Sequence, residues 1–298
     1  WVVRGRHLVG VPKAHQPLFV PPREETAAHA KALLSSWKKN TNRCGMWTRD
    51  CVKRYQIDGE SLGLMRAHEA DPTQEPLRRI FAKGTFPSDN NTLLSMFPDI
   101  KAGDLGSCAV VAVGDNVLKQ GRGEEIDAHD TVFRYNSPMR AFREDIGSKS
   151  DVMYWKMRNN EKDYGQEGQA ADKYYMWKDS SKFIEFGKKE DWASMTFKGK
   201  PILWAVLGGE SRQMWEGLYL KYKADRKLKS GTPAGGFKFA LDVLASGLCR
   251  RIDLYGYTAQ GSGKYFKRAS LMKPVHISGL EHWVYREAQA MGLLCVYD

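Results

Sequence analysis

The stretch CAVVAVGDNVLKQGRGEEIDAHDTVFRYNSPMRAFREDIGSKSD, residues 108–151, carries the clearest pattern in this chain. It opens with a short apolar run, breaks at Gly114, Asp115 and Asn116, and returns to a second run that ends at Asn136. Apolar runs that end in glycine and polar residues are typical of buried parallel strands with a ligand-binding loop at their carboxyl ends. We therefore expect Gly114, Asn116 and Asn136 at one edge of a parallel sheet. The alternative is that the two asparagines only hold their own turns.

Alternation of strands and helices continues beyond this stretch. Short apolar segments predict strands at residues 109–113, 132–135, 152–155, 201–207 and 252–257. Good helix formers predict helices at residues 24–39, 211–229 and 236–245. Strands separated by helices favour right-handed crossovers and a mainly parallel sheet, which is the α/β class. We expect a Rossmann-like domain with a single sheet over residues 104–298, preceded by an N-terminal wrapping segment over residues 1–103.

The composition is that of a globular protein with a basic surface. Hydrophobic residues make up 42% of the 298 residues, and 46 Lys and Arg against 35 Asp and Glu give a net charge of +11. Such a surface favours anionic partners, which include nucleic acid, anionic lipid and acidic sugars. The sequence has no helix-turn-helix pattern, zinc-finger spacing or RRM signature, so we expect no nucleic-acid partner. It also has no apolar run near the roughly 18 residues that cross a bilayer, so we expect membrane attachment only through a removed N-terminal anchor.

The segment GTPAGGFKFALDVLASGLCRRIDLYGY, residues 231–257, is a second candidate ligand site. A Pro/Gly turn precedes a helix, and a strand follows that ends at Tyr257. The turn would direct free backbone N–H groups and the positive end of the helix dipole toward an anion. Gly235 and Gly236 would let a ligand approach closely.

The segment HISGLE, residues 276–281, is the third candidate. Ser278 and Glu281 have the spacing of a capping box, which predicts a helix from Gly279 with His276 just before it. A helix N-terminus disfavours imidazolium, so His276 would stay neutral and accept a proton near pH 7. Glu281 is either a catalytic residue or only the capping residue of this helix.

In this order the three segments resemble the large, small and very small sialylmotifs of the eukaryotic sialyltransferases, glycosyltransferase family 29. The resemblance implies a GT-A-variant-like fold and inverting transfer of sialic acid from a CMP donor to a hydroxyl of an acceptor glycan. It implies that His276 is the general base and that Glu281 is a second catalytic residue. The donor-binding residues that follow from it are Gly114, Asn116, Asn136, Gly235, Gly236, Tyr257 and Tyr265.

The same resemblance implies a disulfide between Cys108 and Cys249, which join the large and small motifs in the family. A disulfide requires an oxidising compartment. The resemblance implies a type II membrane protein of the Golgi lumen. Asn90 begins an N-glycosylation sequon, as a secreted glycoprotein would carry. Cys44, Cys51 and Cys295 can supply a second bridge; a tie between the N-terminal part and the C-terminus is one option, and the pairing is left open.

Several positions depart from the family pattern. The Gly-Asn that follows the first strand in the family aligns with Ala112-Val113, and the Ser-Thr of the small motif aligns with Ala234-Gly235. The family's third motif is a His-Tyr-aromatic stretch between the small and very small motifs, and its histidine aligns with Lys264. These departures surround the donor pocket and agree with a plant or algal sialyltransferase-like member that uses CMP-Kdo and acts on pectin. A non-catalytic protein that binds acidic glycans is a more distant alternative.

No Asp-x-Asp occurs in the sequence, so we expect no metal and no cofactor. A CMP donor carries one phosphate, and basic residues and helix N-termini suffice to neutralise it. The basic run that ends at residue 229 is either a solvated helix end or a dock for an acidic acceptor: Lys221, Lys223, Arg226, Lys227 and Lys229.

Overall fold

The computed structural model of the chain describes residues 22–39, 43–58, 88–135, 140–154, 171–177, 196–197, 199–205, 210–228, 233–257, 264–265 and 278–297.

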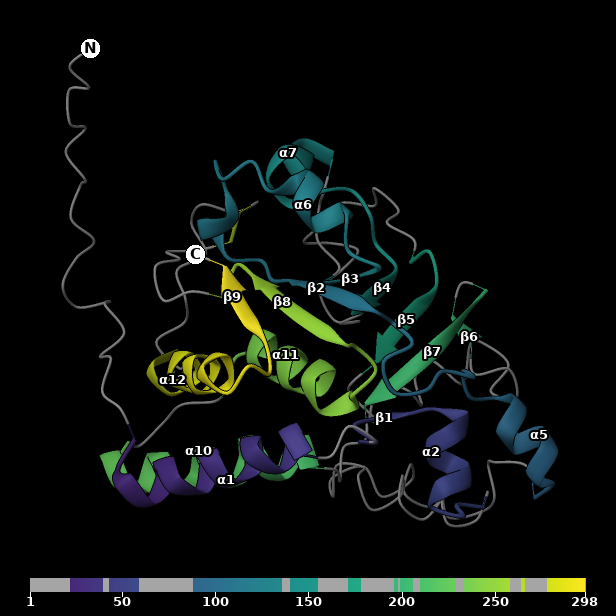
Figure 1. The fold of residues 1–298 in the computed structure, drawn as a ribbon, viewed down its shortest axis with the longest axis horizontal. Coiled ribbons are helices and arrows are strands. Elements are labelled where there is room, and N and C mark those ends of the chain that lie inside the picture. Colours follow the sequence, from purple (N-terminus) through teal and green to yellow (C-terminus); the bar gives the residue numbers. More distant parts are fainter. Residues whose placement is uncertain are drawn as a thin grey trace.

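A mostly parallel sheet forms the centre of the molecule (Figure 1). Within the described residues it has nine strands in the order β1-β7-β5-β4-β3-β2-β8-β9, with β6 paired to β7 off this path. All pairs from β7 to β9 are parallel, whereas β1 and β6 run antiparallel to β7. The strands are β1 (Met46–Trp47), β2 (Ser107–Val111), β3 (Thr131–Tyr135), β4 (Val152–Tyr154), β5 (Tyr174–Trp177), β6 (Thr196–Phe197), β7 (Lys200–Ala205), β8 (Arg251–Tyr255) and β9 (Cys295–Tyr297).

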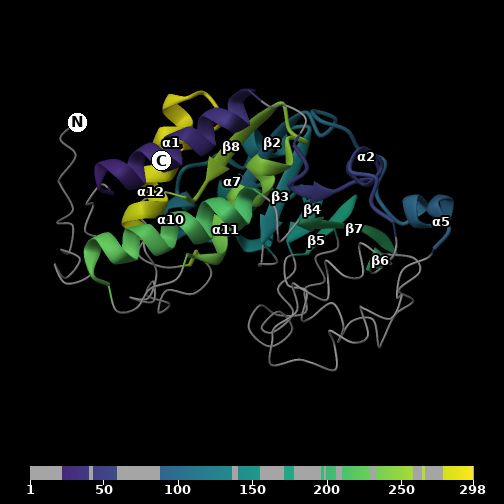
Figure 2. The ribbon, with the colours of Figure 1, turned by 90° about the horizontal axis from the view of Figure 1, so that it is seen from below.

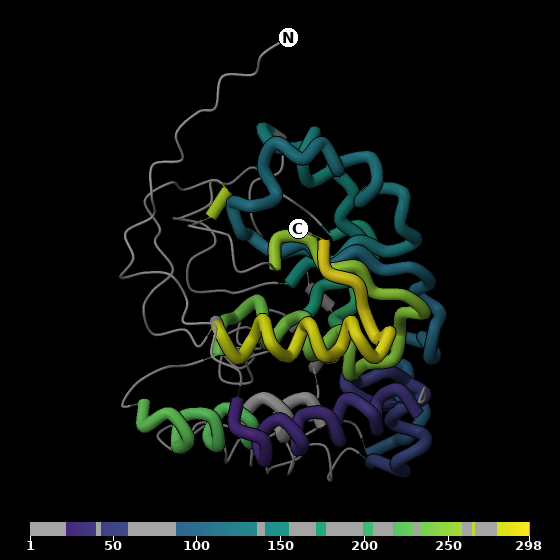
Figure 3. Tube along the Cα trace, turned by 60° about the vertical axis from the view of Figure 1, so that its left-hand side comes forward, coloured from purple at the N-terminus to yellow at the C-terminus, as the bar shows by residue number. Residues whose placement is uncertain are grey.

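Helices cover both faces of the sheet (Figure 1). The helices are α1 (Glu24–Lys39), α2 (Arg49–Arg54), α5 (Asn90–Ser95), α6 (Gly123–Asp127), α7 (Arg143–Ile146), α10 (Glu210–Arg226), α11 (Gly235–Ser246) and α12 (Ser278–Ala290). On one face, α11 and α12 lie between the sheet and an outer layer of α1 and α10 (Figure 3). These two outer helices run side by side (Figure 2). On the other face lie the short helices α6 and α7 (Figure 1).

The core follows the two-residue period of the strands. Val110 of β2 packs with α11 and α12 on one face, whereas Ala109 and Val111 pack with Ile126 of α6 and Ile146 of α7 on the other. Successive side chains of a strand point to opposite faces, so a strand covered on both faces reads as an unbroken apolar run. This burial explains why β2 stands out in the sequence.

The predicted α/β class and single, mostly parallel sheet are confirmed. All five predicted strands and the helices predicted at 211–229 and 236–245 exist, with ends shifted by up to three residues. The sequence patterns missed four strands of two to four residues: β1, β5, β6 and β9. Segments this short are hard to recognise because they hold too few residues to show a period. The division of the chain into two parts at residue 103 stays a prediction. Helix α1 packs into the same core as later helices, and β1 pairs with β7 of the same sheet.

The predicted bridge between Cys108 and Cys249 is present, with the Cα atoms 5.9 Å apart. Cys108 lies in β2, and Cys249 lies just before β8, the strand that pairs with β2. A second bridge is also present, and it does not tie the N-terminal part to the C-terminus. Cys44 pairs with Cys51, only 7 positions away, and Cys295 on β9 is free and exposed. The edge position of β9 holds Cys295 away from the N-terminal cysteines.

Candidate functional site

The loop that follows β2 is held against the ends of two other segments. The Ala112 N–H donates to the Tyr255 carbonyl oxygen over 2.9 Å, and the Tyr265 N–H donates to the Val113 carbonyl oxygen over 3.0 Å. A β-carbon at Gly114 would lie 2.6 Å from the carbonyl oxygen of Gly256. This approach leaves room only for glycine. The structure therefore brings the predicted Gly114 and Tyr265 to the carboxyl edge of β2 and β8, with Asn116 two positions further along the loop.

The start of α11 meets the ends of β3 and β8. A β-carbon at Gly235 would lie 2.6 Å from the hydroxyl oxygen of Tyr135, and one at Gly236 would lie 3.6 Å from Cε1 of Tyr257. The N-cap residue, Ala234, offers no side-chain cap. The first residues of this helix therefore lie against two tyrosine side chains from the carboxyl edge of the sheet, and Gly235, Gly236 and Tyr257 come together as predicted.

Glu281 joins the starts of two helices. It lies in the first turn of α12, and its Oε1 accepts a hydrogen bond of 2.6 Å from the Ala234 N–H of α11. The two residues are 47 positions apart in the chain. The capping-box pattern correctly predicts a helix here, beginning at Ser278, but it carries no sign of this contact across to α11.

The electrostatics of this site follow from burial. Glu281 is 5% exposed, and its burial raises the pKa of the carboxyl to about 7, although the Ala234 N–H and the Lys238 ammonium act to lower it. Burial also raises the pKa values of the Tyr257 and Tyr285 hydroxyls well above their usual range. Both tyrosines therefore stay protonated and can donate hydrogen bonds.

The hydroxyl of Tyr257 has no hydrogen-bond partner among the described residues. Tyr257 is only 6% exposed, so this donor is buried. Leaving a buried hydroxyl unpaired costs about 1–3 kcal/mol. A ligand atom that accepts this bond would recover that cost.

Two predicted residues, Asn136 and His276, lie outside the described residues. Asn136 follows Tyr135 directly in the chain, and His276 precedes the first residue of α12 by two positions. Their roles stay predictions.

Sequence patterns missed Tyr135, Tyr285 and Lys238 as members of this site. Tyr285 lies one helical turn beyond Glu281, and its ring centroid is 5.4 Å from that of Tyr257. The spacing of four on α12 is a usable signal, since such residues share a helix face. Nothing local marks Lys238, which joins the site only because α11 begins beside α12.

The tight start of α11 leads to a test with a matched control. Gly235→Ala should lower the free energy of unfolding by about 1–3 kcal/mol, because the new methyl group meets the Tyr135 hydroxyl. The Tyr135 ring cannot move away easily, since its centroid lies 4.8 Å from that of Tyr154 and 5.2 Å from that of Phe239. Gly236→Ala meets only an ordinary contact and should be neutral or stabilising by up to about 1 kcal/mol. Denaturant unfolding of both variants checks this, and equal losses would contradict the geometry.

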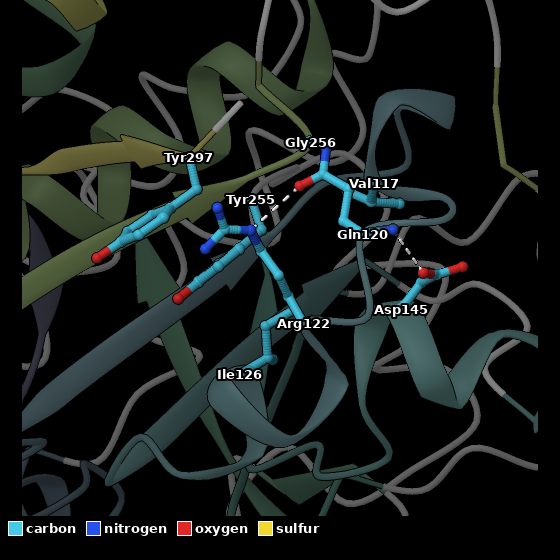
Figure 4. A pocket seen from close by; sticks show the side chains of 8 residues that line it. All are labelled: Val117, Gln120, Arg122, Ile126, Asp145, Tyr255, Gly256 and Tyr297. Carbon is cyan, nitrogen blue, oxygen red and sulfur yellow. Dashed lines mark hydrogen bonds between the residues drawn. The ribbon is translucent and has the colours of Figure 1, made fainter. Parts of the chain in front are cut away.

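Apart from these candidate residues, a small pocket lies on the α6 and α7 side of the sheet edge (Figure 4). The rings of Tyr255 and Tyr297 stack with centroids 4.8 Å apart, and the Arg122 guanidinium lies 4.9 Å from the centre of the Tyr297 ring. The Arg122 guanidinium donates hydrogen bonds to Gln120 Oε1 over 3.1 Å and to Glu125 Oε2 over 2.8 Å. The polar groups bond to one another, so this pocket is a packed edge of the fold. It uses none of the predicted site residues.

The two glycines that flank Arg122, Gly121 and Gly123, have a structural role beside this pocket. Gly121 has a φ of +62°, a conformation that favours glycine. A β-carbon at Gly123 would collide with the carbonyl oxygen of Arg143, so this glycine lets α6 pack against α7.

A buried ion pair links α6 to β8 below the pocket. His129 Nε2 lies 2.9 Å from Oδ2 of Asp253, and His129 Nδ1 lies 3.0 Å from the carbonyl oxygen of Glu125. Since both ring nitrogens face acceptors, the imidazolium form satisfies both. The hydrogen bond to Asp253 raises the pKa of His129. Burial acts to raise the pKa of Asp253, but hydrogen bonds from His129 and Arg251 outweigh it and lower the value.

This pair predicts a pH-dependent stability. Because the pKa of His129 is raised in the folded state, its contribution to the free energy of unfolding is full below about pH 6.5. This contribution is lost as the pH rises through the folded-state pKa of His129. The lowered pKa of Asp253 gives a contribution that is present above about pH 4 and is lost as the pH falls. His129→Gln should cost about 3–5 kcal/mol near pH 6 and less toward pH 9. Denaturant midpoints of both proteins across pH 4–9 test this, and a constant difference would refute it.

Three side chains of the basic run at the end of α10 contact their own surroundings, and Lys229 lies outside the described residues. Lys223 lies 5.2 Å from the ring centre of Tyr219, Arg226 lies 5.9 Å from that of Tyr222, and Lys221 lies 3.7 Å from Glu25 of α1. These contacts favour the helix-end interpretation of the three side chains.

Comparison with known proteins agrees with the resemblance of the motifs. Residues 68–173 match the family model described as glycosyltransferase family 29 (sialyltransferase). The chain is 36% identical over 88 residues to beta-galactoside alpha-2,6-sialyltransferase 2 of Takifugu rubripes, covering 29% of this chain and 16% of that protein. It is 26% identical over 193 residues to alpha-N-acetylgalactosaminide alpha-2,6-sialyltransferase 1 of Gallus gallus, covering 53% of this chain and 33% of that protein. The matches thus span a third or less of these relatives.

Among solved structures, a crystal structure of a mammalian sialyltransferase aligns with 89% of this chain and 94% of its own, at 20% identity and a TM-score of 0.49.

Proposed function

This chain belongs to the sialyltransferase family, glycosyltransferase family 29, and we propose that it transfers sialic acid from a CMP-activated donor to a hydroxyl of an acceptor glycan. The observation that carries this proposal is the buried hydroxyl of Tyr257, which has no partner in the described ranges and lies beside the glycine-rich start of α11. A helix N-terminus and a tyrosine donor together suit a single phosphate group.

On the donor side, the first N–H groups of α11 and the Tyr257 hydroxyl would hold the phosphate of CMP. The tightly packed loop at Gly114 and Asn116 would position the nucleoside at the same sheet edge. The phosphate of the donor gains charge as its bond to the sugar breaks. Fixed donors that are already directed at it stabilise this charge without reorganisation. A metal ion is therefore not part of the proposed mechanism.

On the acceptor side, His276 would take the proton from the attacking hydroxyl. The hydroxyl oxygen forms its bond to the anomeric carbon on the face opposite the phosphate, and CMP leaves with the electrons of the broken C–O bond. This displacement inverts the anomeric configuration. Proximity and orientation of the two substrates supply much of the acceleration.

A Kdo donor is the second candidate, and the position of Lys264 favours it. Lys264 stands where the family's third motif has a histidine, and its backbone forms a β-bridge with Gly114. The substitution thus lies directly beside the proposed donor loop. A change there would alter the contacts of the sugar acid more than those of the nucleotide.

The compartment proposed for this activity is the Golgi lumen. The two disulfides support it, because such bonds persist in oxidising compartments. Of the helices in the described ranges, none has both the length and the hydropathy needed to cross a bilayer.

Release of CMP from the purified protein tests the function. CMP-sialic acid and CMP-Kdo are offered in parallel, each with a pool of β-galactoside and α-N-acetylgalactosaminide acceptors, with and without EDTA. We expect acceptor-dependent release from CMP-sialic acid that EDTA does not reduce. Release from CMP-Kdo alone would assign the second candidate. Absence of CMP binding by calorimetry would refute the donor site.

A further inference from the structure

The positive end of the α11 dipole already has a carboxyl group next to it. Ala234 caps the helix without a side-chain hydrogen bond, and its N–H instead donates to Glu281 Oε1 of α12 over 2.6 Å. Glu281 therefore stands at the position that a bound anion prefers. The proposed phosphate site begins one residue further along the chain, at Gly235 and Gly236.

Two negative charges at one buried helix end repel each other. The interaction of unit charges a few ångströms apart is several times stronger near a protein interior than in water, because the effective dielectric constant is lower. An ionised Glu281 would thus oppose an anion bound at Gly235 and Gly236. A protonated Glu281 would not.

Building on the proposed function, we propose that the anionic group of the donor enters the α11 N-terminus together with a proton on Glu281. Donor binding then takes up one proton, and donor affinity falls as the carboxyl ionises.

Protonation leaves the geometry of the site intact. The carbonyl oxygen of a neutral carboxyl still accepts a hydrogen bond, so Oε1 keeps its bond to the Ala234 N–H. The other oxygen gains a hydrogen and becomes a donor. The link between α11 and α12 therefore survives in both forms, and only the charge changes.

The surroundings of Glu281 allow this change near neutral pH. Burial holds the pKa of its carboxyl at about 7, far above the usual range for glutamate. From α11 it is faced by Lys238, whose ammonium lowers this pKa. Three tyrosines occupy the elements around it: Tyr135 at the end of β3, Tyr257 after β8 and Tyr285 on α12. Burial raises the pKa values of the Tyr257 and Tyr285 hydroxyls, so neither of these two carries charge near pH 7. His282 also lies on α12, with its ring 6.4 Å from Tyr285.

Tyr257 supplies the complementary half of the site. Its hydroxyl stays protonated, is buried, and has no partner within the described part of the chain. It can only gain a hydrogen bond when an acceptor arrives. We expect Tyr257→Phe to weaken donor binding about tenfold or more without lowering the thermal midpoint of the free protein, since hydrogen bonds to charged groups are the stronger ones.

Titration calorimetry of CMP-sialic acid, without acceptor, measures the proposed proton directly. The phosphate diester and carboxylate of this donor stay ionised above about pH 5, so they take up no proton themselves. Binding enthalpies in two buffers of different ionisation enthalpy give the number of protons taken up. We expect uptake of about half a proton near pH 7 that approaches one proton above about pH 8, and a Kd that rises by up to about tenfold per pH unit from about pH 8 toward pH 9.

Two variants of α12 separate the contribution of Glu281 from that of other groups. Glu281→Gln keeps an oxygen for the Ala234 N–H but cannot ionise, and it should bind donor with little proton uptake and a flatter pH dependence. Glu287→Gln is the matched control on the same helix, where Glu287 pairs with Lys31 at the surface, and it should behave as wild type. Unchanged proton uptake in Glu281→Gln would overturn the proposal.

The wild-type measurement also separates this inference from the function. Donor binding without proton uptake would refute the shared site and leave the transferase proposal standing. Failure of CMP-sialic acid to bind at any pH would overturn both.

Discussion

Replacement of His276 by alanine is expected to reduce turnover by about 10²–10⁴-fold while leaving donor affinity nearly unchanged. The reason is that a general base acts on the acceptor hydroxyl in the transition state and makes no contact that holds CMP. Initial rates at saturating donor and acceptor, together with calorimetric affinity for CMP-sialic acid, give the two quantities separately.

His29→Ala is a suitable control for this prediction. His29 lies on α1, in the helical layer away from the sheet, and half-buried. Its loss should leave turnover within about twofold of wild type, as expected of a side chain that touches no reacting group. Turnover that survives the loss of His276 would remove that residue from the mechanism and reopen the assignment of the base.

Loss of the bridge between Cys108 and Cys249 is expected to lower the free energy of unfolding by about 4–5 kcal/mol. The bridge closes a loop across 141 positions, and chain-entropy stabilisation increases with loop length. The double variant with alanine at both positions is preferable to serine, because Cys108 is fully buried and serine would add a polar hydroxyl to the core. Guanidinium unfolding of this variant against wild type measures the difference.

The second bridge provides an internal control. Cys44 and Cys51 are separated by only 7 positions, so the corresponding double alanine variant should lose about 2 kcal/mol. Equal losses for the two bridges would mean that loop length does not govern their contributions.

Local patterns in the sequence were sufficient for the central strands and the main helices. Strand β2 is buried on both faces and α1 has good helix formers with acidic residues at its start and basic residues at its end. Such signals arise from neighbours in the chain, so they can be recognised without the fold. The resemblance of three motifs supplied the pairing of Cys108 with Cys249 and the candidate residues of the donor site.

The relations between distant segments required the folded chain. Glu281 meets Ala234 only because α12 packs beside α11, and among the described residues the buried Tyr257 hydroxyl has no partner where β8 ends near the start of α11. The same packing buries Glu281 and raises its pKa to about 7. Residue types and spacings specify local conformation, whereas burial, charge and free hydrogen bonds depend on which surfaces meet. The proposal that a proton accompanies the donor rests on the burial and charge of Glu281, which only the tertiary structure shows.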